Sequence, residues 1–324
     1  MAQDPKTARL VRVLTDGRPA NLTQALGLAE ALARIVAVEI ETAEVRLEGW
    51  RARLPGPLAA AALPRGAWSA LRPRPDLAIG AGRRGNLAAR LLARAGVPAV
   101  AVLDPGRPLG DFAAVVLPEH DRRRGGNVLT TLGAMSRLTP QAIAAAPCPV
   151  PRLPAPRLAV LIGGPSRSAG FDAGALLADL DRFRGWSVIA TASRRTPAGL
   201  VARLRAARPG DFIWDGTGPN PYPGMLGLVD AVLVTADSIS MASEAATSGR
   251  PVFVSGRPSP GKNARFHAAL AARGIARPAE AAPALWRYPP LAEADRIAAL
   301  LARRLGFLPG DAAPIQEASK RRPP

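Results

Sequence analysis

Hydroxyl and carboxylate side chains gather at the end of a short apolar run in the second half of the chain. Residues 231–235 suit a buried parallel strand, and Asp237 or Ser238 can cap the helix predicted to follow it. Gly249 and Pro251 are typical of the end of that helix. The first turn of a helix carries N–H groups without partners, and the helix dipole favours negative charge there. The pattern therefore predicts a site for a phosphate or diphosphate.

The same helix adds polar groups beside the predicted anion. Ser238, Ser240 and Met241 fall in or next to its first turn, and Glu244 lies further along it. A carboxylate at that place could accept hydrogen bonds from the two neighbouring hydroxyls of a ribose while the serines hold the phosphates. This arrangement suits a nucleotide sugar. The alternative is a capped amphipathic helix whose glutamate is only solvated.

Two more loops at strand ends of this half combine hydroxyl groups with arginine. The loop after the strand predicted at 157–162 brings N–H groups, hydroxyls and a guanidinium to one point, which predicts a phosphate cradle. The loop after the strand at 186–191 contains Arg194, which could neutralise a leaving diphosphate. The alternatives are an ordinary connecting loop and a solvated corner. The cradle residues are Gly163, Gly164, Ser166, Arg167 and Ser168.

A third loop, residues 215–225, is dense in glycine and proline. Because proline restricts the backbone, we expect this loop to be rigid and to bind part of a ligand. A nucleobase would fit beside it, with Asp215 and Asn220 nearby and Tyr222 or Met225 covering a face of the ring.

The first half contains a glycine motif with two interpretations. Gly80, Gly82 and Gly85 match G-x-G-x-x-G, and Asp104 ends the next predicted strand roughly 20 residues on, which would suit a dinucleotide-dependent oxidoreductase. The motif follows a later strand rather than the first, however, and no Tyr-x-x-x-Lys or His/Asp relay for hydride transfer follows it. We favour an anion cradle for an acceptor phosphate, formed by Gly17, Gly80, Gly82 and Arg83.

Two places in the first half offer a general base. His120 lies between Glu119 and Asp121, after the last predicted strand of this half, and Asp16 follows the first strand. A single histidine is usually structural, but one flanked by carboxylates at a strand end is a candidate for proton transfer. The predicted catalytic residues are Asp16, His120 and Asp121.

The composition narrows the classes of protein. The 324 residues carry a formal charge of +18, which would attract nucleic acid, anionic lipid or phosphorylated substrates. With 4% aromatic residues and no recognition motif, nucleic acid is the least favoured of these. One cysteine and the lack of a Cys/His cluster predict neither a disulfide nor a bound metal, and we expect no cofactor. No secretory sequence and no membrane-spanning run is apparent, so we expect a cytoplasmic protein.

Strands and helices alternate through both halves, which predicts an α/β protein with two Rossmann-like domains and a cleft between them. The proline-rich residues 147–156 cannot be helical and are expected to form a stiff connector. The predicted divisions are an acceptor-side domain at 1–150, a nucleotide-sugar domain at 151–308, and a disordered basic tail at 309–324.

Several of these segments resemble one protein family. They include Leu-Thr-Asp16-Gly17-Arg-Pro-Ala-Asn21, Pro118-Glu-His120-Asp121, Asp215-Gly-Thr-Gly-Pro-Asn220-Pro-Tyr-Pro-Gly-Met225 and Thr235-Ala-Asp237-Ser-Ile-Ser240-Met. With Gly80-Ala-Gly82-Arg-Arg and Ile162-Gly-Gly164, they are similar to the mitochondrial fission family named after an elongated-mitochondria phenotype, and to its bacterial relatives. The likeness spans about residues 9–275.

The resemblance implies a GT-B-like pair of Rossmann-type domains, similar to the lipid-linked N-acetylglucosaminyltransferase of peptidoglycan synthesis. The first hypothesis is a metal-independent glycosyltransferase that takes a nucleotide-diphosphate sugar, with a role in cell-envelope glycan synthesis. The second is a GT-B-shaped adaptor without turnover, bound to membranes or proteins.

Residues 46–74 favour a membrane contact. Trp50 and Trp68 are interleaved there with arginines, a combination suited to an anionic bilayer surface at the inner face of the membrane and to a lipid-linked or other anionic acceptor. The alternative is a crossover segment with buried tryptophans and solvated arginines.

Overall fold

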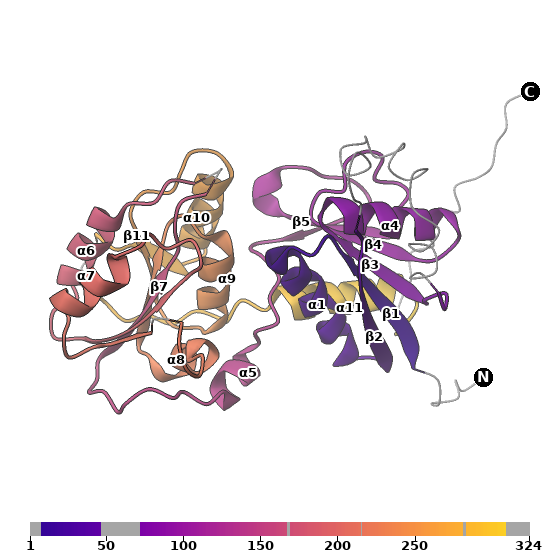
Figure 1. Cartoon of the computed structure of the whole chain (residues 1–324). Coiled ribbons are helices and arrows are strands. Elements are labelled where there is room, and N and C mark those ends of the chain that lie inside the picture. The colour runs from indigo at the N-terminus through magenta and orange to yellow at the C-terminus, as the bar shows by residue number, and fades with distance from the viewer. Residues whose placement is uncertain (1–7, 47–71, 167–168, 215, 281–282, 309–324) are drawn as a thin grey trace, which may run out of the picture. The chain divides into compact units, whose positions relative to one another are not determined.

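The computed structural model describes residues 8–46, 72–166, 169–214, 216–280 and 283–308. They form two compact units, each an open parallel sheet covered by helices, as the sequence predicts (Figure 1). Unit 1 contains the described parts of Met1–Pro118, Arg123–Thr131 and Ala294–Pro324, and unit 2 contains Glu119–Arg122 and Leu132–Glu293. Residues 47–71, which make up most of the predicted membrane contact at 46–74, and the predicted tail at 309–324 lie outside the described residues.

Unit 1 has six parallel strands in the order β2-β1-β3-β4-β5-β6. Helix α4 covers one face of the sheet, and α1 and α11 cover the other (Figure 1). The strands are β1 (Arg9–Thr15), β2 (Val38–Glu44), β3 (Leu77–Ala81), β4 (Ala99–Val102), β5 (Ala114–Pro118) and β6 (Val128–Thr131). The helices are α1 (Pro19–Ala33), α4 (Gly82–Arg94) and α11 (Glu293–Arg304).

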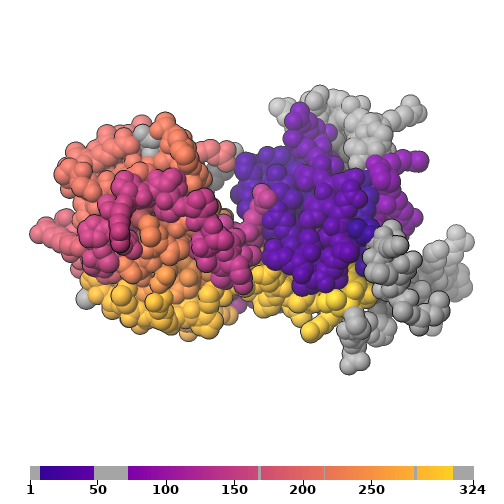
Figure 2. All heavy atoms as spheres, turned by 90° about the horizontal axis from the view of Figure 1, so that it is seen from below, coloured from indigo at the N-terminus to yellow at the C-terminus, as the bar shows by residue number. Residues whose placement is uncertain are grey.

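Helix α11 packs with unit 1, although the sequence groups it with the second half. Asp295 forms an ion pair of 2.5 Å with Arg34, the residue that follows α1, and Arg296 donates to the carbonyl of Thr130 at 2.5 Å. The space-filling view shows its yellow atoms lying along the indigo and violet atoms of unit 1 (Figure 2). The predicted domain boundary at residue 150 lies inside unit 2, whose main segment begins at Leu132.

Unit 2 also has six parallel strands, in the order β12-β11-β10-β7-β8-β9. The strands are β7 (Arg157–Ile162), β8 (Ser187–Ala192), β9 (Phe212–Trp214), β10 (Ala231–Thr235), β11 (Val252–Ser255) and β12 (Ala276–Pro278). The helices are α5 (Pro140–Ala145), α6 (Ala173–Asp181), α7 (Leu200–Ala207), α8 (Tyr222–Leu228), α9 (Ile239–Thr247) and α10 (Lys262–Ala272), and the short helix η2 (Glu119–Asp121) packs here too.

Alternation along β7 divides the core of unit 2 into two layers. Leu158, Val160 and Ile162 face α6 and α7, whereas Ala159 and Leu161 belong to the layer that contains α8, α9 and α10. Successive side chains of a strand point to opposite faces, so an apolar strand such as β7 must be covered on both.

The proline-rich segment 147–156 has no helix or strand, as predicted, but it packs within unit 2. A Cβ atom placed on Gly224 of α8 would lie 2.3 Å from the carbonyl oxygen of Pro147. The segment is therefore fixed against α8 by backbone contact.

The glycine motif of the first half brings α4 close to the sheet. A Cβ on Gly85 would lie 2.2 Å from the carbonyl oxygen of Leu14 in β1, and a Cβ on Gly80 would lie 2.7 Å from the carbonyl of Gly85. Glycine is needed at both positions because the helix and strand backbones meet without room for a side chain.

Gly85→Ala should therefore destabilise unit 1. We expect a loss of about 1–3 kcal/mol in the free energy of unfolding, the usual cost of overpacking. Denaturant unfolding measures it, with Gly126→Ala as the control because no atom lies within 4 Å of a Cβ there. Equal stability of the two variants would show that the contact at Gly85 can relax.

Candidate functional site

The sequence-predicted donor residues of unit 2 meet where its chain order reverses. Strands β7 and β10 are neighbours, but the chain leaves them toward opposite edges of the sheet. The loops after two such strands border a crevice, the usual ligand position in open α/β sheets. Here these loops carry Gly163 and Gly164 after β7, and Asp237 and Ser238 after β10.

Asp237 holds the two loops together. Its carboxylate is fully buried and accepts the amide of Gly164 at 3.0 Å and the hydroxyl of Thr235 at 2.7 Å. Thr235 in turn accepts the amide of Gly163 at 2.8 Å. Arg195 pairs with the same carboxylate at 3.1 Å. A buried charge needs such a full set of partners, so the network fixes both loops in one arrangement.

The amides of Gly163 and Gly164, predicted to cradle a phosphate, are thus bound to protein oxygens. A Cβ on Gly163 would lie 2.3 Å from an Asp237 oxygen, and one on Gly164 would lie 1.9 Å from the carbonyl of Arg195. The glycine pair allows this close approach, and the anion it surrounds is the Asp237 side chain.

The arginine that contacts the Asp237 network is Arg195, whereas the sequence predicts its neighbour Arg194. Both arginines are exposed, and of the two it is Arg195 that donates to Asp237 and to the carbonyl of Gly164. Ser166 closes its own turn, accepting the amide of Ala169 at 3.1 Å. Three predicted residues, Arg167, Ser168 and Asp215, lie outside the described residues.

The start of α9 keeps free donors. Ser238 is buried and caps the helix by accepting the amide of Met241 at 3.3 Å. The amides of Ile239 and Ser240 have no acceptor within the described part of the chain, and the Ser240 side chain is exposed. Two amides without an acceptor and a hydroxyl therefore lie at the positive end of the helix, where an anion would be favoured.

Glu244 is held by two side chains. Its carboxylate accepts the hydroxyl of Tyr222 at 2.5 Å and that of Ser136 at 3.3 Å. Burial raises the pKa of Glu244, and burial beside this carboxylate raises the pKa of the Tyr222 hydroxyl. Asn220 orients Tyr222 by accepting its amide at 3.0 Å. The glutamate is thus positioned rather than simply solvated.

Of the two methionines among the predicted donor residues, Met225 lies in the core and Met241 packs against it. Met225 is fully buried in the layer between α8 and the sheet, and Met241 packs against the same layer. Met225 therefore supports α8 from inside and has no surface to offer a ligand.

Helix α10 supplies two residues that the sequence analysis missed. Asn263 donates to the carbonyl of Asp237 at 3.3 Å, and Nε2 of His267 lies 3.0 Å from the carbonyl of Ala236. A carbonyl only accepts, so His267 carries its proton on Nε2, and burial lowers its pKa. Residues four apart share a helix face, which is the pattern that could have revealed the pair. Asn263 and His267 therefore hold the backbone carbonyls of the turn that precedes α9.

His120 belongs to unit 2 and packs against α10. The ring is buried, meets Phe266 edge to face at 5.8 Å, and has no partner for Nδ1 within the described residues. The surrounding turn is fixed by ion pairs of Glu119 with Arg273 at 3.0 Å and of Asp121 with Lys262 at 2.5 Å. Burial lowers the pKa of His120. Burial thus favours the neutral form of the ring.

The predicted acceptor-side residues of unit 1 meet at its own point of reversed strand order, between β1 and β3. Asp16 accepts the amide group of Asn21 at 3.0 Å and the backbone amide of Arg18 at 3.3 Å. A Cβ on Gly82 would lie 2.4 Å from an Asp16 oxygen, so Asp16 lies against the start of α4. Arg83 and Gly17 are exposed beside it, whereas Gly80 is buried in β3 and serves packing.

The fold is shared with a class of solved structures. The chain aligns over 94% of its length with 98% of a putative UDP-N-acetylglucosamine 2-epimerase from Listeria monocytogenes, at TM-score 0.57 and 12% identity. It also matches the Neisseria meningitidis 2-epimerase bound to UDP-GlcNAc (12% identity, 92% of each chain, TM-score 0.52) and a spinosyn forosaminyltransferase (15% identity, 94% and 97% covered, TM-score 0.52). The protein has the GT-B-like fold of such glycosyltransferases and epimerases.

Residues 19–305 match the family described as "Mitochondrial fission ELM1", and the chain belongs to that family. It is 37% identical over 166 residues to the mitochondrial fission protein ELM1 of Arabidopsis thaliana, which covers 47% of this chain. It is also 26% identical over 227 residues, 56% of this chain, to the uncharacterized protein RP120 of Rickettsia prowazekii. The chain spans 39% and 64% of the lengths of these two relatives. None of the helices that the structure describes combines the length and apolar character needed to cross a bilayer.

The two histidines, the chain's full complement, should make stability depend on pH. Both have folded-state pKa values below 6.5, so the unfolded chain binds more protons as the pH falls below about 6.5. Stability is therefore fully present above pH 6.5 and is lost as the pH falls toward the folded pKa values. Denaturant unfolding at pH 7.5 and 5.5 should show a smaller loss for His120→Gln combined with His267→Gln than for the unaltered protein. An identical loss in both would contradict the assignment.

Proposed function

We propose that unit 2 binds a nucleotide-diphosphate sugar and that the protein is a GT-B-type glycosyltransferase acting without a metal. The observation that carries this proposal is the free start of α9 followed by an anchored Glu244. The diphosphate would accept hydrogen bonds from the amides of Ile239 and Ser240, and Glu244 would accept them from the ribose hydroxyls. Tyr222 and Ser136 keep the carboxylate in place for that contact.

The neighbouring folds support the nucleotide. Two of the similar structures are described as UDP-N-acetylglucosamine 2-epimerases, one of them bound to UDP-GlcNAc, and the third is a glycosyltransferase. UDP is accordingly the first nucleotide to test, and a lipid-linked or other anionic molecule is the proposed acceptor.

Transfer requires stabilisation of the leaving diphosphate and removal of a proton from the acceptor hydroxyl. The start of α9 and exposed Arg194 would provide the first, as fixed positive groups aimed at developing charge. Asp16 or His120 would provide the second. Burial lowers the pKa of His120, which suits a neutral base, and its buried Nδ1 would have to become accessible to reach an acceptor.

Glu244→Ala should weaken UDP binding at least tenfold, roughly the loss of a hydrogen bond to a charged group. Isothermal titration calorimetry with the full chain measures it. Glu39→Gln is the control, because Glu39 is an exposed carboxylate on β2 of unit 1. Thermal unfolding should show that the Glu244 variant remains folded. Unchanged UDP affinity would remove Glu244 from the site.

Turnover should depend on one of the two base candidates. Release of nucleoside diphosphate from a panel of sugar donors gives the rate, and either Asp16→Asn or His120→Gln should lower it about 100-fold with donor affinity unchanged. Full rates in both variants would exclude both residues as the base. Donor binding without release from any donor would favour the adaptor hypothesis.

A further inference from the structure

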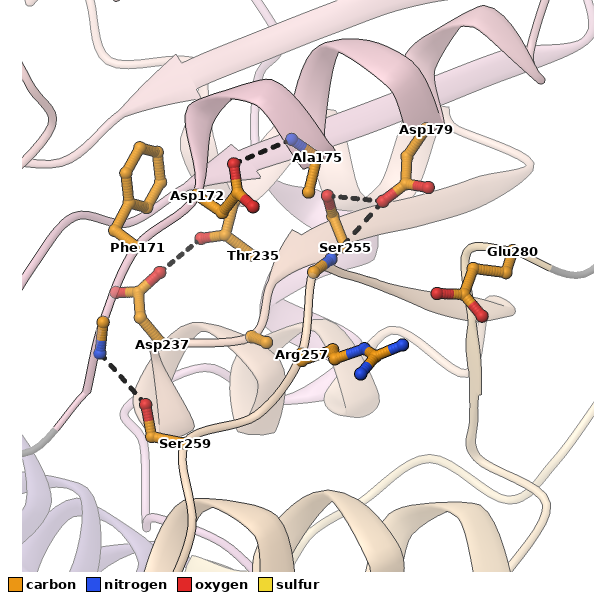
Figure 3. A pocket seen from close by; sticks show the side chains of 13 residues that line it. Phe171, Asp172, Ala175, Asp179, Thr235, Asp237, Ser255, Arg257, Ser259 and Glu280 are labelled. Atoms are coloured by element: carbon orange, nitrogen blue, oxygen red, sulfur yellow. Dashed lines mark hydrogen bonds between the residues drawn. The ribbon is translucent and has the colours of Figure 1, made fainter.

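A cavity of about 450 Å³ lies in unit 2 beside the predicted diphosphate position (Figure 3). Helix α6 forms one wall, and the segments that follow β10 and β11 form the others. Of the predicted donor residues that the structure describes, only Asp237 lines it. Small-molecule sites typically enclose about 300–1,000 Å³, so the cavity is large enough for one sugar ring.

The polar groups of the walls are fixed in place. Asp179 of α6 accepts the hydroxyl of Ser255 at 2.8 Å and the amide of Gly256 at 3.4 Å. Asp172 caps α6 at the amide of Ala175, 3.0 Å away. Ser259 accepts the amide of Gly170 at 3.0 Å. Oδ2 of Asp179 accepts both of its bonds, whereas the acceptor oxygens of Asp172 and Ser259 each keep a further lone pair. The walls therefore offer acceptors to a ligand that donates, and the Phe171 ring adds an apolar surface.

The charges of the lining do not suit a phosphate. Two of the four described lining carboxylates form ion pairs with arginines that do not line the cavity. Asp179 pairs with Arg182 at 3.8 Å, and Asp237 pairs with Arg195 at 3.1 Å. Among the lining residues that the structure describes, Asp172 and Glu280 then face a single cation, Arg257. The side chains of Arg257 and Glu280 pair with no described residue, and Arg257 points toward Glu280 across the opening (Figure 3). The described lining carries no excess positive charge, in a chain of net charge +18, which disfavours anions and suits a neutral ring rich in hydroxyl groups.

The cavity and the start of α9 share one stretch of backbone. Thr235, Ala236 and Asp237 line the cavity, and Ser238 caps α9 directly after them. We infer that the cavity receives the glycosyl group of the donor, and that its acidic lining selects a neutral sugar over an anionic one. This inference rests on the proposed nucleotide-sugar binding, and it adds the class of sugar and the residues that choose it.

The first test fills the cavity. Ala175 of α6 lines it, whereas Ala178 of the same helix is exposed and lies outside. In calorimetry on the full chain, Ala175→Leu should bind UDP like the unaltered protein but bind UDP-N-acetylglucosamine at least about tenfold more weakly. Ala178→Leu, the matched control, should change neither affinity.

The second test changes charge without changing shape. The unaltered protein should bind UDP-N-acetylglucosamine more tightly than UDP-glucuronic acid, and Glu280→Gln should reduce the ratio of the two affinities about threefold, as expected for one exposed charge. Asp181→Asn removes an exposed carboxylate of α6 that does not line the cavity, and should leave the ratio unchanged.

The outcomes distinguish failure of this inference from failure of the proposed nucleotide-sugar binding. If UDP binds and neither Ala175→Leu nor Glu280→Gln alters the binding of either sugar nucleotide, the cavity is not the glycosyl site although nucleotide binding stands. Failure of UDP and both sugar nucleotides to bind the unaltered protein would overturn the proposed function and this inference together.

Discussion

The buried carboxylate of Asp237 is the constraint on which unit 2 depends. A charge with no exposed surface must be compensated inside the protein, and here the compensation comes from Gly164, Thr235 and Arg195 on three different strand ends. Satisfying that one group fixes the loops after β7, β8 and β10 relative to one another. The free amides at the start of α9 gain their position from this network, because Ser238 follows Asp237 directly.

Helix α10 also supports the turn between β10 and α9. Asn263 and His267 bind the carbonyls of Asp237 and Ala236, so the turn is held through its oxygens while its later amides stay open. The same helix binds the turn around His120 through Arg265, Lys262 and Arg273. One helix thus carries both the turn proposed to bind phosphate and a proposed base, which makes it a positioning element for the chemistry.

Glycine has different roles in the two units. In unit 1 the motif that resembles a dinucleotide fingerprint lets α4 approach β1, since Gly85 lies against the Leu14 carbonyl. In unit 2 the pair at Gly163 and Gly164 makes room for the Asp237 carboxylate. In both cases the absence of a side chain brings backbone close to a protein oxygen. A glycine pattern therefore indicates close approach, and the approaching group need not be a ligand.

The sequence by itself determined the parallel α/β architecture and its strands, because buried parallel strands are continuous apolar runs and helix caps and glycine stops mark the rest. It also located the α9 start, since Asp237, Ser238 and Ser240 follow β10 directly. Only the tertiary structure decided that Arg195 rather than Arg194 meets Asp237, that α11 returns to unit 1, and that Asn263 and His267 hold the turn. These contacts join residues far apart in the chain or choose between adjacent side chains. Local patterns fix which residues can form helices and strands, whereas the packing of those elements fixes which polar groups find each other.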